Sequence, residues 1–113
     1  PPYFIDIKAD KNRLVQVFEN IISNVAKYAK TDVEISAVKI ENGAEITFRD
    51  FGKGIPEDEI PFIFDKFYRG SRINNENGAG LGLYIVKYVA IQSGGNVYAE
   101  NLPDGFQIKI ILP

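Results

Sequence analysis

Residues 11–29 read KNRLVQVFENIISNVAKYA, and this stretch has the strongest helical periodicity in the chain. Its apolar side chains recur at intervals of three and four residues, which predicts an amphipathic helix with one buried face. Asp10, just before it, is a suitable N-cap residue. The apolar stripe consists of Leu14, Val17, Phe18, Ile21, Ile22, Val25 and Tyr28.

Asn20, Asn24 and Lys27 lie along one flank of this predicted helix, because they are spaced four and three residues apart. Asn is a poor helix former, so a pair of them in mid-helix costs stability with no local gain. Such an Asn can cap a neighbouring loop or simply face water. The pair together with Lys27 favours a binding role for this flank.

Outside this helix, alternating apolar and polar residues predict strands, and an Asn42-Gly43 pair favours a hairpin turn between two of them. A short helix is expected over residues 57–64, with Pro56 at its start. A second long helix is expected to end near Ser93, before two glycines. The expected strands cover residues 3–8, 33–40, 44–50, 96–100 and 106–112.

The chain has 113 residues, of which 45% are hydrophobic and 25% charged, so we expect residues 1–113 to form a single domain. A net charge of −2 without a basic block argues against nucleic acid as a partner. With no cysteine and no histidine, only carboxylates, amides and phosphates are available to hold a metal. The chain shows neither a signal peptide nor an apolar run near the ~20 residues that span a bilayer. It begins with Pro1 and lacks Met, so we expect a fragment of a longer protein.

Two glycine-rich segments are candidates for ligand binding. Asp50 ends a predicted strand just before Gly52 and Gly54, where its carboxylate can face a cavity or bond its own turn. Residues 65–77 are polar without a clear period, which is typical of a lid or of disorder. Residues 77–83 (NGAGLGL) then open the second helix, and such a glycine loop is either an anion site or a plain turn.

The order of these features fits the needs of an adenine nucleotide. A carboxylate such as Asp50 accepts a hydrogen bond from the exocyclic amino group of adenine, whereas guanine presents a carbonyl oxygen there. The amide oxygen of Asn24 suits Mg²⁺, and Lys27 and Arg69 can offset phosphate charge. Neither a P-loop motif nor the dinucleotide-binding fingerprint is present.

Over essentially its whole length the chain resembles the catalytic ATP-binding domain of sensor histidine kinases, within the gyrase/chaperone/histidine kinase ATPase superfamily, and the resemblance is carried by four segments in this order. They are residues 18–28 (FENIISNVAKY), 50–55 (DFGKGI), 63–70 (IFDKFYRG) and 78–83 (GAGLGL). The resemblance implies an α/β (α+β) two-layer sandwich, with a mixed sheet of about five strands, three helices on one face and a mobile ATP lid.

The same resemblance implies roles for individual residues. Asn24 would coordinate Mg²⁺, Asp50 would read adenine, and Tyr28 would pack beside the base. Asn20, Lys27 and Arg69 would attend the phosphates as catalytic residues. The other implied ATP contacts are Gly52, Gly54, Ile55, Phe67, Gly78, Gly80, Leu81, Gly82 and Leu83.

The implied function is to bind Mg-ATP and donate its γ-phosphate to a histidine on a separate dimerisation domain of the full-length kinase, upstream of a response regulator. The implied location is the cytoplasmic part of a membrane-anchored sensor, with a monomeric fragment and a dimeric full-length kinase. This chain has no histidine and cannot form phosphohistidine alone. It also departs from the family near its last strand, where residues 104–107 read DGFQ instead of Gly-x-Gly-Thr.

Three other functions use the same fold. ATP hydrolases of the superfamily resemble one another in carrying a water-activating glutamate one helical turn before the Mg²⁺-binding Asn, but here that position is Asn20. A serine-directed anti-sigma kinase is a second alternative, although residues 64–69 and the lid length favour the histidine kinase. An inert nucleotide-binding module is the third, and the intact Asn24, Asp50 and glycine segments count against it.

Overall fold

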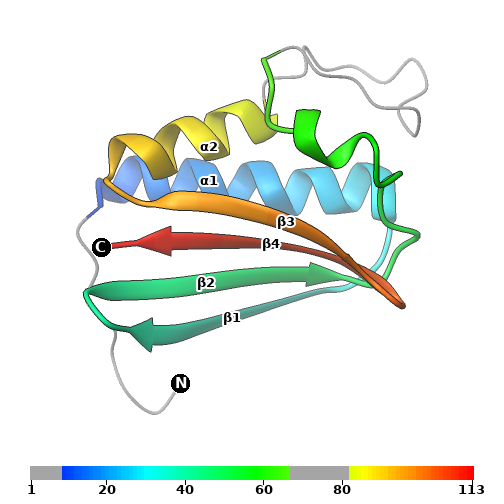
Figure 1. The fold of residues 1–113 in the computed structure, drawn as a ribbon, viewed down its shortest axis with the longest axis horizontal. Helices are drawn as coiled ribbons and strands as arrows, with labels where there is room; N and C mark the ends of the chain where they lie inside the picture. Colours follow the sequence, from blue (N-terminus) through cyan, green and yellow to red (C-terminus); the bar gives the residue numbers. More distant parts are fainter. Residues whose placement is uncertain (1–8, 67–81) are drawn as a thin grey trace.

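The computed structural model describes residues 9–66 and 82–113 as two layers, with two helices covering one face of a four-stranded sheet (Figure 1). The sheet has the order β1-β2-β4-β3, and every neighbouring pair is antiparallel. The expected strand at residues 3–8 lies outside the described residues. The expected mixed sheet is therefore not seen in the described part, where all neighbouring strands are antiparallel. The elements are α1 (Lys11–Asn24), β1 (Val33–Ile40), β2 (Gly43–Asp50), α2 (Gly82–Gln92), β3 (Asn96–Leu102) and β4 (Gly105–Leu112).

The hydrophobic core lies between the helices and the two central strands. Strands β2 and β4 bury alternate residues, and their register places Phe48 opposite Ile108 on the helix-facing side. The ring of Phe18 on α1 meets Phe48 edge to face, with ring centroids 4.9 Å apart. Other core residues are Val17, Ile21, Ile46, Val86, Val89, Ala90, Phe106, Ile110 and Leu112.

Helix α1 begins where the sequence predicts, because the Asp10 carboxylate caps it. Asp10 Oδ1 accepts hydrogen bonds from the backbone N–H groups of Asn12 at 2.9 Å and Arg13 at 3.2 Å. Most of the predicted apolar stripe is buried or partly buried, but Ile22 is 41% exposed. Its assignment to the buried stripe was wrong, because Ile22 is turned about 100° around the helix from the fully buried Ile21.

The predicted uninterrupted α-helix over residues 11–29 also needs correction at its C-terminal end. Val25–Ala29 form a π-helical turn, in which the Lys30 N–H donates to the Val25 carbonyl at 2.7 Å. Lys30 then adopts a left-handed conformation (φ 57°) and ends the helix. A π turn is wider than an α turn, so Lys27 and Tyr28 are rotated from the positions that uniform helical spacing gives them. Such turns occur frequently at functional sites.

The two hairpins are confirmed, with one shift of the first turn. Strands β1 and β2 pair up to Ile40 and Gly43, so the turn consists of Glu41 and Asn42 and lies one residue earlier than the predicted Asn-Gly turn. Asn42 has the positive φ (64°) that the prediction required of a turn residue.

The third helix is not confirmed. In place of an α-helix over residues 57–64 the structure has a single 3₁₀ turn, Ile60–Phe62. Pro61 explains the difference, because it has no N–H and cannot continue an α-helical ladder. Helix α2 is confirmed and ends before Gly94, whose φ of 90° suits a helix stop. Within the described residues, no helix has the length and apolar character needed to cross a membrane.

Candidate functional site

Asp50 is the one charged residue that is buried in the described part of the chain, with 4% of its surface exposed. It ends the β2 row whose preceding buried members are Ala44, Ile46 and Phe48. Its Oδ1 accepts a hydrogen bond from the Gly52 N–H at 2.9 Å. The carboxylate therefore does stabilise its own turn, one of the two roles considered from the sequence, and a buried charge requires such partners.

The loop after Asp50, residues 52–55, is packed closely against its surroundings. A Cβ added to Gly52 would lie 3.0 Å from the Cβ of Ala29, at the end of the π turn. Gly54 has a φ of 79°, which other residues rarely adopt. The Ile55 side chain is 6% exposed and belongs to the core. The loop is thus fixed between the end of α1 and the sheet.

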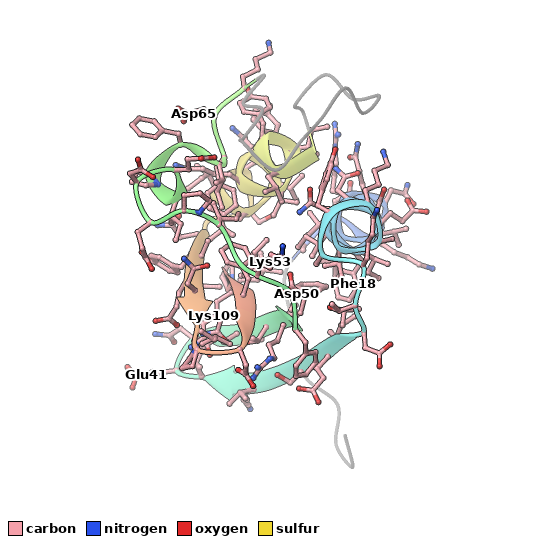
Figure 2. The ribbon with its side chains drawn as sticks, turned by 90° about the vertical axis from the view of Figure 1, so that its right-hand side faces the viewer. Phe18, Glu41, Asp50, Lys53, Asp65 and Lys109 are labelled. Carbon is pink, nitrogen blue, oxygen red and sulfur yellow. The ribbon has the colours of Figure 1, made fainter. Side chains whose placement is uncertain are left out.

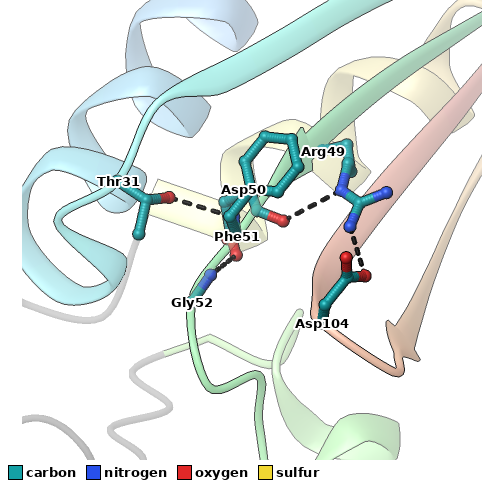
Figure 3. Close-up of polar contacts among 6 residues, drawn as sticks. All are labelled: Thr31, Arg49, Asp50, Phe51, Gly52 and Asp104. Atoms are coloured by element: carbon teal, nitrogen blue, oxygen red, sulfur yellow. Dashed lines mark hydrogen bonds and ion pairs between the residues drawn. The ribbon is translucent and has the colours of Figure 1, made fainter.

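Thr31 links this loop to the segment that follows α1 (Figure 3). Its hydroxyl accepts the Phe51 N–H at 3.0 Å and donates to the Asp32 carbonyl at 2.9 Å. The hydroxyl therefore holds the residue next to Asp50 from the α1 side.

Arg49, on β2, connects the same point to Asp104 in the β3–β4 turn, as Figure 3 shows. Its Nε donates to the Asp50 carbonyl at 3.3 Å, and its Nη2 pairs with Asp104 Oδ1 at 2.5 Å. The guanidinium also lies 4.3 Å from the centroid of the Phe51 ring. The departure from the family pattern at residues 104–107 therefore supplies a carboxylate partner for Arg49.

The glycine in that departure has a separate steric role. A Cβ on Gly105 would lie 2.1 Å from the Asp50 carbonyl oxygen, so the β3–β4 turn approaches the end of β2 closely only with glycine there. Gln107 takes no part in this site, since its Nε2 donates to Glu100 Oε1 at 2.5 Å. It pairs across β4 and β3 on the sheet face that alternates with the buried one.

The polar flank of α1 and of the π turn that follows it carries three further predicted site residues. Asn20 and Asn24 are half-buried and Lys27 is exposed. The Asn20 side-chain amide donates to the Gly82 carbonyl at 3.3 Å, which joins α1 to the first residue of α2. Figure 2, viewed from the end of the sheet where Asp50 lies, shows Asp50 and Lys53 on the side of the sheet that faces the helices.

The described structure joins Gly52 to Asp50 and Asn20 to Gly82 among the predicted site residues, and several of the others lie outside its described part. Tyr28 is half-buried in the π turn, and Leu83 packs against the core. A Cβ on Gly82 would meet no described heavy atom within 4 Å. Phe67, Arg69, Gly78, Gly80 and Leu81 lie outside the described residues, as does most of the predicted lid.

Sequence reasoning assigned no role to Thr31, Arg49 or Asp104. Thr31 offers no sequence signal, because a Thr after a helix is ordinary. Asp104 stands at the departure from the family pattern, and that anomaly was the available signal for its pairing with Arg49.

Comparison with known proteins assigns this arrangement to a family. Residues 9–113 match the family model described as histidine kinase-, DNA gyrase B-, and HSP90-like ATPase. The chain belongs to this ATPase family. The resemblance to histidine kinase ATP-binding domains is thereby confirmed.

Individual sensor kinases resemble this ATPase domain over nearly its whole length. The sensor protein VanS of Enterococcus faecium is 35% identical over 116 residues, which cover 99% of this chain and 30% of VanS. The mycobacterial sensor histidine kinase MprB superposes with a TM-score of 0.85 at 32% identity, covering 95% of this chain and 76% of that one. Full-length ShkA in complex with AMPPNP gives a TM-score of 0.82 at 30% identity, covering 97% of this chain and 23% of ShkA. The chain spans less than a third of the length of the curated relatives it matches.

Replacing Thr31 by Val tests whether its hydroxyl holds the site. The change removes the acceptor for the Phe51 N–H while keeping the side-chain shape, so we expect a loss of about 1 kcal/mol in the free energy of unfolding. Hydrogen exchange followed by NMR should show faster exchange of the Phe51 amide in Thr31→Val. Thr31→Ser retains the hydroxyl and should exchange like the unchanged protein. Equal protection of Phe51 in all three proteins would contradict the assigned contact.

Proposed function

We propose that this ATPase domain binds Mg-ATP and donates the γ-phosphate to a histidine on a separate phosphoacceptor domain, in two-component signalling. The observation that carries the proposal is the buried carboxylate of Asp50 at a strand end, held in one orientation by its loop. The family supports it, and so does the complex of the related ShkA with AMPPNP, an adenine nucleotide.

In this proposal Asp50 selects the base. An ionised carboxylate accepts the exocyclic amino hydrogen of adenine and repels the carbonyl oxygen that guanine presents at the same place. Burial strengthens the discrimination, because little water competes for the carboxylate. Tyr28, Gly52 and Gly54 line the base side of the site, with Ile55 supporting the loop through the core.

Asn24 is the proposed Mg²⁺ ligand. Mg²⁺ prefers oxygen ligands and commonly keeps several waters while it bridges substrate phosphates. The half-buried amide of Asn24 suits this use. The described residues contain no group of three or more His, Cys, Asp or Glu placed to hold a metal ion. With the Asn24 amide oxygen as the proposed protein ligand, the remaining ligands of the cation would be phosphate and water oxygens.

The phosphates are proposed to lie along the polar flank of α1, near Lys27 and Asn20. Arg69, Phe67 and residues 78–83 would complete the phosphate side as a lid that includes Leu83. A histidine nitrogen attacks the γ-phosphorus, the bond between phosphorus and the β,γ-bridging oxygen breaks, and ADP leaves with that electron pair. This chain would contribute positioning and charge neutralisation to the transfer.

Hydrolysis of ATP is a weaker alternative for this chain. The amide of Asn20 has no basicity, and its nitrogen donates a hydrogen bond to the Gly82 carbonyl. Asn20 therefore cannot act as the general base that activates a water molecule.

The proposal extends to the complete protein. We propose that a histidine-bearing dimerisation domain and a response regulator are its partners, and that the full-length kinase is a membrane-anchored dimer with this domain on the cytoplasmic side. We also propose that the complete domain has a fifth strand at residues 3–8 and a mobile ATP lid over residues 65–77.

Asp50→Asn tests base selection. The change keeps the size of the side chain but removes the negative charge, so we expect ATP affinity to fall roughly tenfold to a hundredfold, or about 1.5–3 kcal/mol. Isothermal titration with Mg-ATP and Mg-GTP measures both affinities. The same change at the exposed Asp58 is the matched control and should leave both unaltered. ATP binding by Asp50→Asn at the original affinity would refute the assigned role.

Asn24→Ala tests the metal ligand. Removal of the amide oxygen should weaken the dependence of ATP affinity on Mg²⁺ concentration, because one protein ligand of the ion is lost. Titrations with ATP at a series of Mg²⁺ concentrations measure this dependence, with Ser23→Ala, an exposed neighbour on α1, as the control. If the dependence is the same in both variants, Asn24 does not bind the ion.

Transfer to a partner tests the kinase assignment directly. The chain is mixed with a histidine-bearing dimerisation domain and ATP labelled at the γ-phosphate. We expect label on the partner that is lost in acid, as phosphohistidine is, and little free phosphate. Rapid phosphate release without labelled partner would support the hydrolase instead.

A further inference from the structure

Asn101 on β3 binds both backbone polar groups of Ile55. Its Oδ1 accepts the Ile55 N–H at 2.9 Å, and its Nδ2 donates to the Ile55 carbonyl at 2.6 Å. The Nδ2 also donates to Glu57 Oε1 at 3.1 Å. A side-chain amide can make such a pair because it has one acceptor and one donor group, as a neighbouring strand does.

These two hydrogen bonds supply partners that the backbone of the loop needs at Ile55. Ile55 is buried, and buried backbone N–H and C=O groups must find partners. The loop that contains Ile55 belongs to none of the four strands, so no sheet ladder supplies those partners. Asn101, which lies 46 positions later in the chain, supplies them instead.

Gly54 fits closely against the same side chain. A Cβ on Gly54 would lie 2.3 Å from Asn101 Oδ1, so the amide occupies the space that glycine leaves open. At the other end of the loop, the Gly52 N–H is bonded to Asp50 Oδ1. The loop is therefore anchored by Asp50 at its start and by Asn101 at its end, and a displacement of Ile55 reaches the Asp50 carboxylate through only three residues.

We propose that Asn101 is a positioning residue for base selection: by fixing Ile55, it holds the loop in the one conformation that presents Asp50 to adenine. This inference rests on the proposed ATP site. Asn101 acts through Ile55 and Asp50 and makes no contact with the nucleotide. Its loss should therefore reduce the preference for adenine more than the binding of the phosphates.

Asn101→Ala removes both bonds to Ile55, and we expect ATP affinity to fall roughly fivefold to tenfold. Affinity for GTP, which Asp50 does not favour, should change less than about twofold. Isothermal titration gives both affinities, and hydrogen exchange of the Ile55 amide reports the local contact. Asn96→Ala is the matched control, since it removes the same side chain from the same strand at a position where, in the described part of the chain, its hydrogen bonds go to Val97 and Tyr98.

Asn101→Asp covers the case in which the alanine variant does not fold. It keeps the shape and the acceptor for the Ile55 N–H, but loses the donor and places a negative charge beside Glu57. We expect a loss of ATP preference in this variant too, because the carboxylate faces the Ile55 carbonyl oxygen in place of the lost donor. Faster Ile55 exchange with an unchanged ratio of ATP to GTP affinity in the folded variants would overturn the proposal and leave Asn101 a purely structural role. If the unchanged protein binds no ATP, the proposed function itself fails, and this inference fails with it.

Discussion

The loop that forms the candidate site depends on the burial of one carboxylate at the end of a row of apolar side chains. Asp50 continues the buried row of β2 and is as enclosed as the isoleucine and phenylalanine residues before it. Removing a charge from water is costly unless hydrogen bonds replace the lost hydration. The Gly52 N–H supplies one of them, which requires the chain to turn back immediately after the strand. The tight turn at Gly52 follows from this requirement.

Two regions far from it in the sequence hold that turn. Thr31 contacts it from the segment after α1, Arg49 links it to Asp104 in the β3–β4 turn, and Asn101 fixes its end from β3. The Arg49–Asp104 pair adds little stability, because the Asp104 side chain is 75% exposed. The pair instead fixes the position of the turn after β2 relative to the β3–β4 turn. A site that is already arranged before its ligand arrives loses less entropy on binding, so small contacts of this kind support selectivity.

Local patterns in the sequence predicted the parts of the fold that local chemistry determines. The Asp10 cap, the stripe of α1, both hairpins and the strand-end position of Asp50 were all predicted in this way. The π turn at Val25–Ala29 has no counterpart in the residue pattern, since the same residues also fit an α-helix. The contacts of Thr31 and Asn101 join residues distant along the chain, which periodicity cannot reveal. Pro61 was a visible signal against the third helix that the prediction did not take into account.

The pair of asparagines on α1, which costs helix stability, has a partial structural explanation. Asn20 donates a hydrogen bond to the Gly82 carbonyl and so connects the two helices at the start of α2. An ionised glutamate cannot donate that bond and would place a negative charge against the carbonyl oxygen. Asn20, whose lack of basicity argues against hydrolysis, is therefore also the residue that makes the contact between the helices. In this chain the same amide that joins α1 to α2 excludes a general base at that position.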